Sequence, residues 1–240
     1  MLNKVALITG ASRGLGQTLA TFLAGRGFHL IITGRGGEAL AATAQALEKY
    51  GQTVIAIGGD VNDPIHRQQL AQAAQQLGRL DLLVNNASIL GPSPQPMLAD
   101  YPIETLEQVL AVNLLAPLAL IQTTLPLLKQ SHGLIVNITS DAAVGGYAGW
   151  GGYGASKAAL ELMSLTLSHE LQDDGISVVS VDPGDLRTQM HQEAFPGEDI
   201  SDRPLPAVTI PFWAWLLGQD PLAITGHRFQ AQTERWLIPA

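Results

Sequence analysis

Residues 5–16, VALITGASRGLG, decide the fold of this chain. The first five form an uninterrupted run of strand-favouring residues, the pattern of a strand that is buried on both faces. A glycine-rich turn, residues 10–16, leads from this strand into a helical pattern that ends at Gly27. A strand, a glycine-rich turn and a helix in this order predict the opening unit of an α/β sheet.

The same alternation continues along the rest of the chain. Short apolar runs separated by helical patterns predict further strands at residues 30–32, 54–57, 80–84, 134–138 and 176–181. Helices of this length between strands require right-handed crossovers and therefore a parallel sheet that is covered on both sides. No linker divides the chain. We predict a single α/β domain over residues 1–240, with a doubly wound parallel sheet of about seven strands.

The composition limits the classes of function. The chain is 46% hydrophobic, 14% charged and has a net charge of −8, which indicates a globular protein and argues against a nucleic-acid or membrane partner. It has no cysteine, which fits a cytoplasmic location, and its six histidines show no ligand spacing, so we expect no metal site. The first four residues lead directly into a strand, which argues against a signal peptide. The most apolar stretch, residues 109–121, is too short to span a bilayer.

The glycine-rich turn has the properties of a phosphate-binding loop. Small residues let the backbone approach a pyrophosphate at the amino end of a helix, where free N–H groups and the helix dipole favour an anion. A glycine-rich turn alone is a weak signal, but its place between the first strand and the first helix strengthens it. We expect a dinucleotide to contact Gly10, Ser12, Arg13, Gly14, Leu15 and Gly16.

The end of the second strand indicates which dinucleotide is bound. A carboxylate there would hold the ribose 2′-hydroxyl of NAD(H), whereas an arginine accommodates the 2′-phosphate of NADP(H). The strand ends at Gly34 and Arg35 without an acidic residue, and Arg13 supplies a second cation. We therefore predict NADP(H) as the cofactor. The alternative is that both arginines are solvated surface residues.

Tyr153 and Lys157 form the candidate acid–base pair. They are four residues apart, so on a helix their side chains share one face. A phenol is a poor acid at pH 7, and a nearby ammonium favours the phenolate and lowers the phenol pKa. Ser140, just after the strand at residues 134–138, would present its hydroxyl to the same place. Such a pair is common on solvated helix faces, so the pair alone does not establish function.

These motifs, taken in order, resemble those of the short-chain dehydrogenase/reductase family over roughly residues 3–190. Residues 9–16 are similar to the family's T-G-x-x-x-G-x-G motif, and Asp60-Val61 matches the pair that contacts adenine. Asn85-Asn86-Ala87 matches three of the four residues in N-N-A-G. The resemblance implies a Rossmann-type fold. It also places the family's catalytic tetrad at Asn113, Ser140, Tyr153 and Lys157, and its nicotinamide-binding segment at Pro183, Gly184 and Thr188.

The resemblance also implies a role for each of these residues. Tyr153 would exchange a proton with the oxygen of a carbonyl/alcohol substrate, and Lys157 would lower the Tyr153 pKa and bind the nicotinamide ribose. Ser140 would hold the substrate oxygen. Asn86 and Ala87 would contact the cofactor, and the expected assembly is a homodimer or homotetramer that buries paired helices.

One feature bears on Asn113 independently of the family. Pro117, four residues later, has no N–H, so within a continuous helix the Asn113 carbonyl would lose its partner and be free to bind a relay water. The alternative is an ordinary proline kink in which Asn113 is a core amide.

Two departures from the family pattern stand out. Ser88 replaces the glycine after Asn-Asn-Ala and adds a hydroxyl near the cofactor channel. The C-terminal segment, residues 225–229, keeps only the T-G of the usual ending, which we expect to affect oligomer contacts and not the chemistry.

The substrate side is expected to be lined by residues 90–97, residues 142–150 and a lid near 185–206, which carries charges of both signs. The sequence predicts an NADP(H)-dependent oxidoreductase that acts on a carbonyl/alcohol substrate. It leaves two alternatives open: a regulator that senses redox state by binding a dinucleotide without turnover, and a lyase or epimerase on the same scaffold.

Overall fold

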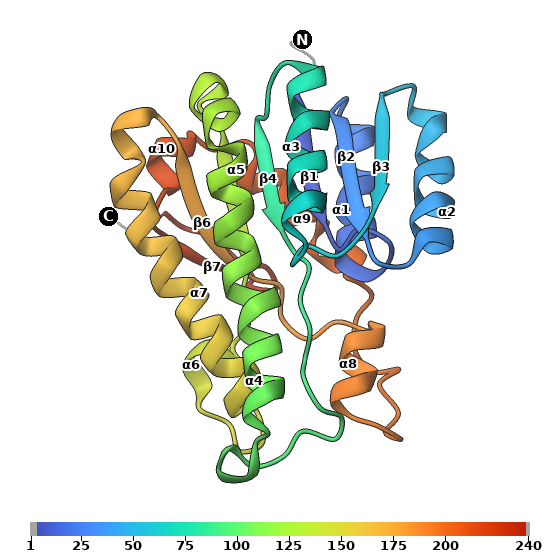
Figure 1. Ribbon diagram of the computed structural model, residues 1–240, viewed down its shortest axis with the longest axis vertical. Coiled ribbons are helices and arrows are strands. Elements are labelled where there is room, and N and C mark those ends of the chain that lie inside the picture. The colour runs from blue at the N-terminus through green and yellow to red at the C-terminus, as the bar shows by residue number, and fades with distance from the viewer. Residues whose placement is uncertain (1–3, 239–240) are drawn as a thin grey trace.

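Seven parallel strands form the centre of the computed structural model, which describes residues 4–238. The strand order is β3-β2-β1-β4-β5-β6-β7 (Figure 1). The strands are β1 (Val5–Thr9), β2 (His29–Gly34), β3 (Val54–Gly58), β4 (Leu82–Asn85), β5 (Leu134–Ile138), β6 (Ser177–Asp182) and β7 (Arg228–Gln230). The Rossmann-type α/β fold expected from the sequence is confirmed. Residues 1–3 and 239–240, which the predicted domain and its N-terminus include, lie outside the described residues.

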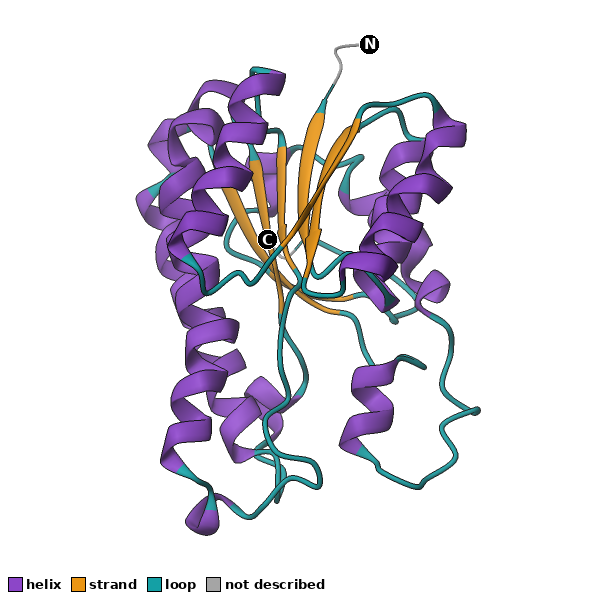
Figure 2. Cartoon of the chain, turned by 45° about the vertical axis from the view of Figure 1, so that its right-hand side comes forward, coloured by secondary structure: helices purple, strands orange, loops and turns teal. Residues whose placement is uncertain are grey.

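Helices cover both faces of the sheet (Figure 2). One core packs the sheet against α1 (Gly14–Gly25), α2 (Gly37–Leu47) and α9 (Ile210–Leu216). The opposite core packs it against α3 (Pro64–Leu77) and α5 (Ala116–Ser131), beside which α7 (Gly151–Glu170) runs along β6. The strands β1, β2, β4, β5 and β6 bury side chains in both cores, which explains why their sequences are continuous apolar runs.

Shorter elements complete the chain. The remaining helices are α4 (Ile103–Leu110), α6 (Ala142–Gly145), α8 (Gln189–Ala194) and α10 (Pro221–Ile224). Single turns of 3-10 helix are η1 (Glu48–Tyr50), η2 (Leu98–Asp100), η4 (Gln172–Asp174) and η5 (Pro206–Thr209), and η3 (Ala111–Leu115) is a turn of π-helix.

The apolar stretch at residues 109–121 is part of a helix that is longer than the stretch itself. α4, η3 and α5 run on as one 29-residue helix, which by length and composition alone is long and apolar enough to cross a membrane. In this fold it packs against α3, α7 and strand β4, as a core helix does. The π turn lies just before Pro117, whose missing N–H cannot close an ordinary α-helical hydrogen bond.

The carboxyl ends of the strands point to one edge of the sheet, where the loops that carry the predicted site residues gather. α6 and α8 lie beyond this edge, below the sheet in Figure 1. The order of strands reverses between β1 and β4, and parallel α/β sheets bind ligands at such a switch point. The fold therefore places the glycine loop and the Tyr153 region beside one another.

Candidate active site

The glycine loop is shaped by close backbone contacts. A Cβ atom on Gly16 would lie 2.3 Å from the Gly10 carbonyl oxygen, so no side chain fits there. Gly10 and Gly14 have φ angles of +67° and +58°, in the left-handed region that favours glycine. Asn86 fixes the loop from the neighbouring strand, because its Nδ2 donates to the carbonyls of Thr9 (2.8 Å) and Gly10 (3.1 Å). The Asn86 side chain therefore builds the cradle.

The amino end of α1 is open for an anion. Arg13 occupies the N-cap position, but its side chain makes no capping hydrogen bond. It therefore does not accept a hydrogen bond from the N–H groups of the first turn. These N–H groups belong to the residues from Gly14 onward and point toward the carboxyl edge of the sheet. The arrangement fits a pyrophosphate at residues 14–16.

The two predicted phosphate-binding arginines lie in different settings. Arg35 follows the end of β2, is exposed and makes no ion pair or hydrogen bond with its side chain within residues 4–238. The Arg13 guanidinium instead bonds to Gln189 of α8, on the opposite side of the cleft. Ser12 lies beside Gly34, the residue before Arg35, because a Cβ on Gly34 would lie 3.0 Å from the Ser12 hydroxyl oxygen. Arg35 is thus the freer of the two cations.

The residues expected to contact adenine, Asp60 and Val61, follow β3. Val61 packs with Val112 and Ala116 in a small apolar cluster against which Ala87 also packs. The carboxylate of Asp60 accepts a hydrogen bond from the Asn62 N–H at 2.9 Å, which holds the loop after β3 in place.

Tyr153 and Lys157 share one face of α7, and both are buried. The Lys157 Nζ lies 5.5 Å from the centre of the Tyr153 ring and donates to the Ile138 carbonyl at 2.8 Å. Burial raises the pKa of Tyr153 to about 12 and lowers that of Lys157 to about 7. The net pKa of Tyr153 is therefore raised and not lowered as the sequence led us to expect, because burial disfavours the charged phenolate.

Ser88, a hydroxyl that the family pattern lacks, lies beside Tyr153. Its side chain lowers the Tyr153 pKa, against the larger effect of burial. The Ser88 Oγ is itself buried and has no hydrogen-bond partner among the described residues. The Ser140 hydroxyl, in contrast, donates to Asp141 Oδ1 at 2.9 Å and accepts from the Ala142 N–H at 3.2 Å. Ser88 is therefore the less committed hydroxyl.

The Asn113 side chain is fully engaged in the core. Its Oδ1 accepts from the Ile89 N–H at 2.9 Å, and its Nδ2 donates to the Ile89 carbonyl (2.9 Å) and the Ser156 Oγ (3.0 Å). This amide clamps the loop after β4 onto the helix that carries Asn113. A role in proton relay would therefore use the main-chain carbonyl, which remains a prediction.

The predicted nicotinamide segment lies over the glycine loop. Gly184 has a φ of +71° and donates its N–H to Asp182 Oδ1 at 2.9 Å. The methyl group of Thr188 lies 3.5 Å from where a Cβ on Gly14 would be, and its hydroxyl caps α8 by accepting from the His191 N–H. Of the residues predicted to bind the nicotinamide, Pro183, Gly184 and Thr188, the last thus lies against the glycine loop.

The three segments expected around the substrate contact one another. The Ser93 hydroxyl donates to the Glu193 carbonyl at 2.6 Å, which ties residues 90–97 to α8 of the predicted lid. The Trp150 ring lies 6.0 Å from the rings of Tyr153 and Phe195, measured between centroids. The base of the lid closes where the Arg187 N–H donates to the Pro204 carbonyl at 2.8 Å.

Three charged residues near the site were not singled out from the sequence. Arg228, from the edge strand β7, bonds to Glu161 and Asp182 and to the carbonyl of Ser140. Two of them could have been found from their spacing in the sequence. Asp182 directly precedes Pro183, and Glu161 follows Lys157 by one helical turn. The expectation that the departure at residues 225–229 affects oligomer contacts and not the chemistry stays a prediction, although Arg228 of this segment contacts the Ser140 carbonyl.

Comparisons with known proteins give the same picture. A family model described as short chain dehydrogenase matches residues 4–199. The chain is 37% identical over 238 residues to YciK of Escherichia coli K12, an oxidoreductase, with 97% of this chain and 93% of YciK covered. It is 35% identical to the 3-oxoacyl-acyl-carrier-protein reductase of rhamnolipid biosynthesis from Pseudomonas aeruginosa PAO1, with 90% and 84% covered.

The fold also matches solved structures. One is a short chain dehydrogenase from Shigella flexneri 2a complexed with NADP, with a TM-score of 0.87 and 34% identity, over 96% of this chain and 98% of that one. The sequence match spans most of the domain, and the fold agrees with it. On these grounds the chain belongs to the short-chain dehydrogenase/reductase family of oxidoreductases.

Proposed function

We propose that the protein is an NADP(H)-dependent oxidoreductase that transfers a hydride between the nicotinamide and a carbonyl/alcohol substrate. The observation that carries this proposal is the buried pair formed by Tyr153 and Lys157 at the carboxyl edge of the sheet, opposite the phosphate loop. A redox sensor needs the phosphate loop to bind the dinucleotide, but it has no need of a phenol and an amine that are buried side by side.

The state of Tyr153 suits carbonyl reduction. With its pKa raised to about 12, the phenol is neutral at pH 7 and carries the proton that a substrate oxygen must receive. Bound NADPH would supply the hydride. Tyr153 donates its proton to the substrate oxygen as that oxygen becomes an alkoxide, so a carbonyl becomes an alcohol and the phenol becomes a phenolate.

Lys157 stabilises that phenolate. Its Nζ is held by the Ile138 carbonyl, near the Tyr153 ring, so a protonated amine places a positive charge beside the oxygen that has lost its proton. The Lys157 pKa of about 7 also allows the amine to give up a proton near neutral pH and restore the phenol. In the reverse direction the same groups remove the proton of an alcohol.

Two hydroxyls support the substrate oxygen in this proposal. Ser88 lies against Tyr153 and has a free hydrogen-bonding capacity, and Ser140 reaches the oxygen by exchanging its Asp141 partner. Arg35 would hold the 2′-phosphate of NADP(H), since no acidic residue follows β2 and the side chain of Arg35 is exposed. The NADP-bound relative supports the same cofactor.

The surface suggests an assembly. Ile103, Leu115, Leu162 and Leu165 are exposed apolar side chains on the long helix and on α7. A second copy would cover them, so we propose a homodimer or homotetramer. We propose a cytoplasmic location because the sequence has no cysteine.

The test is a panel of carbonyl compounds, including a 3-oxoacyl thioester, followed by the absorbance of NADPH. Net loss of NADPH with at least one carbonyl supports the proposal. Binding of NADPH with no loss across the panel favours the regulator, and conversion of a substrate without net change in NADPH favours a lyase or epimerase.

A further inference from the structure

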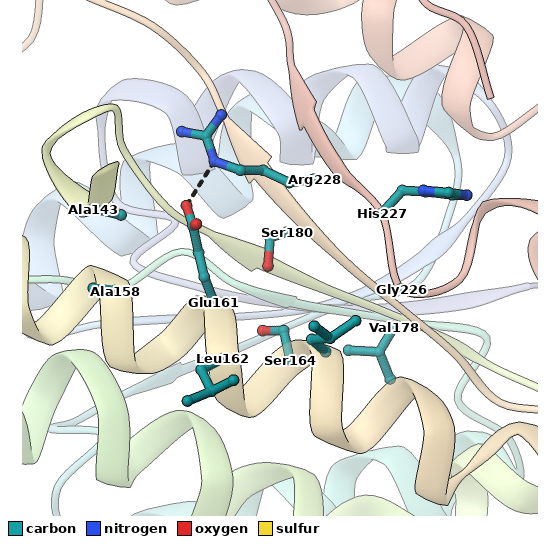
Figure 3. Close-up of a pocket in the computed structure, with 11 residues that line it drawn as sticks. Ala143, Ala158, Glu161, Leu162, Ser164, Val178, Ser180, Gly226, His227 and Arg228 are labelled. Atoms are coloured by element: carbon teal, nitrogen blue, oxygen red, sulfur yellow. Dashed lines mark hydrogen bonds and ion pairs between the residues drawn. The ribbon is translucent and has the colours of Figure 1, made fainter. Parts of the chain in front are cut away.

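Arg228 reaches from the edge strand β7 toward α7, across a pocket of about 320 Å³ (Figure 3). Its Nε donates to Glu161 Oε1 at 2.8 Å. Its Nη2 donates to Asp182 Oδ2 at 3.1 Å and to the Ser140 carbonyl oxygen at 3.2 Å. One guanidinium therefore joins two carboxylates and a main-chain carbonyl.

Each partner of Arg228 is attached to a different part of the site. Asp182 ends β6 and accepts the Gly184 N–H through its other oxygen, so it holds the predicted nicotinamide segment. The main-chain carbonyl that Arg228 contacts belongs to Ser140 itself. Glu161 lies one helical turn after Lys157 and also accepts from the Thr139 hydroxyl at 2.6 Å.

The geometry requires an arginine. Three separate acceptors are met by the fixed fork of one guanidinium, which a single ammonium point charge cannot reproduce. The Asp182 side chain is only 5% exposed, and burial raises its pKa while Arg228 lowers it. Without Arg228, a buried carboxylate beside the nicotinamide segment would have no cation as partner.

We propose that Arg228 is a positioning residue that sets the backbone of Ser140 and the Pro183–Gly184 segment in register with each other and with α7. This inference rests on the proposed function, because it assigns Arg228 to the alignment of substrate oxygen and nicotinamide. Arg228 acts through Asp182, Glu161 and the Ser140 carbonyl and does not touch the reacting atoms.

The competing explanation is that the Arg228 side chain has a purely structural role and only attaches a short edge strand to the sheet. β7 has other anchors: the Ser180 N–H donates to the His227 carbonyl at 3.1 Å, the Ala231 N–H donates to the Asp182 carbonyl at 2.8 Å, and Phe229 is buried in the core. These anchors do not involve the Arg228 side chain. Replacing that side chain therefore leaves the strand attached and separates the two explanations.

The test compares Arg228→Met and Arg228→Lys with a control, His227→Gln. The His227 side chain lines the same pocket, points away from Glu161 in Figure 3, and makes no side-chain hydrogen bond within residues 4–238. All variants are assayed at a temperature at which circular dichroism shows each one fully folded. The readouts are kcat, KM for the carbonyl, and the Kd of NADPH from its fluorescence.

For Arg228→Met we expect kcat to fall by about tenfold to a hundredfold, since misplacement by about 1 Å has effects of that size. We also expect the Kd of NADPH to rise several-fold, and Arg228→Lys to restore neither value. The control should match the wild type. Wild-type kcat and Kd in folded Arg228→Met, with only a lower unfolding temperature, would overturn the proposal in favour of the purely structural role.

A variant that changes only a charge adds a second readout, the pH profile, which a purely structural role would not change. Glu161→Gln keeps an oxygen acceptor for Arg228 and Thr139 but removes the carboxylate that raises the Lys157 pKa. The pH profile of kcat should therefore shift to lower pH, and an unmoved profile contradicts the link to α7. If the wild type binds NADPH but turns over no carbonyl, the proposed function fails, and the change in Kd with Arg228→Met still decides the positioning.

Discussion

Replacing Asn113 with alanine should destabilise the fold more than any ordinary surface change. The substitution leaves the N–H and the carbonyl of Ile89 without their partners and removes one donor to Ser156. Each backbone group left unpaired on burial costs about 1–3 kcal/mol, so the two partly buried groups of Ile89 together cost about 2–6 kcal/mol. For a domain of this size, about 1 kcal/mol corresponds to roughly 2–4 °C, so the unfolding temperature should fall by about 4–24 °C.

The assay is thermal and urea unfolding followed by circular dichroism, with Gln122→Ala as the matched control. Gln122 is exposed on the same long helix, so its replacement should leave the unfolding temperature nearly unchanged. A fall no larger than that of the control would refute the clamp that we assign to the Asn113 side chain. Below its transition, the folded variant should keep more activity than a Tyr153 variant, because the main-chain carbonyl remains.

Three further predictions address the cofactor and the acid–base pair. Arg35→Ala should weaken the binding of NADPH far more than that of NADH, whereas Arg26→Ala, a control just after the end of α1, should change neither; equal losses for the two cofactors would argue against a 2′-phosphate at Arg35. Burial lowers the Lys157 pKa from 10.5 to about 7, so between these values the unfolded chain binds more protons and stability should rise with pH; urea midpoints that rise as steeply in Lys157→Met would contradict this. Ser88→Gly removes the hydroxyl that lowers the Tyr153 pKa, so in alcohol oxidation the activity should need a higher pH than in the wild type, and an unchanged pH profile would show that this hydroxyl has no effect on Tyr153.

Local patterns account for most of the fold. The run at residues 5–9 and the glycine turn after it become β1 and the loop before α1, because a strand buried on both faces leaves a continuous apolar signal. The expected strands pair in one parallel sheet, as the alternation with helices requires. The short edge strand β7 was implied only by the expected count of about seven, because three residues give no periodicity.

The site was less predictable where burial or distant contacts decide its properties. Tyr153 and Lys157 share a helix face as their spacing predicts, but spacing does not reveal how much water surrounds them, and burial sets both pKa values. Arg228 lies 46 residues from Asp182 and 67 from Glu161, separations at which no periodic pattern connects side chains. The commitment of the Asn113 amide to Ile89 depends on tertiary packing in the same way.

The central claim is that Tyr153 gives its proton to the substrate oxygen while the hydride arrives from a bound nicotinamide. The most direct measurement is the rate of NADPH consumption by Tyr153→Phe with a carbonyl that the wild type reduces, together with the Kd of NADPH. We predict a rate lower by about 10²–10⁴-fold, the usual contribution of a general acid, with the Kd nearly unchanged. A rate within a few-fold of the wild type would contradict the account.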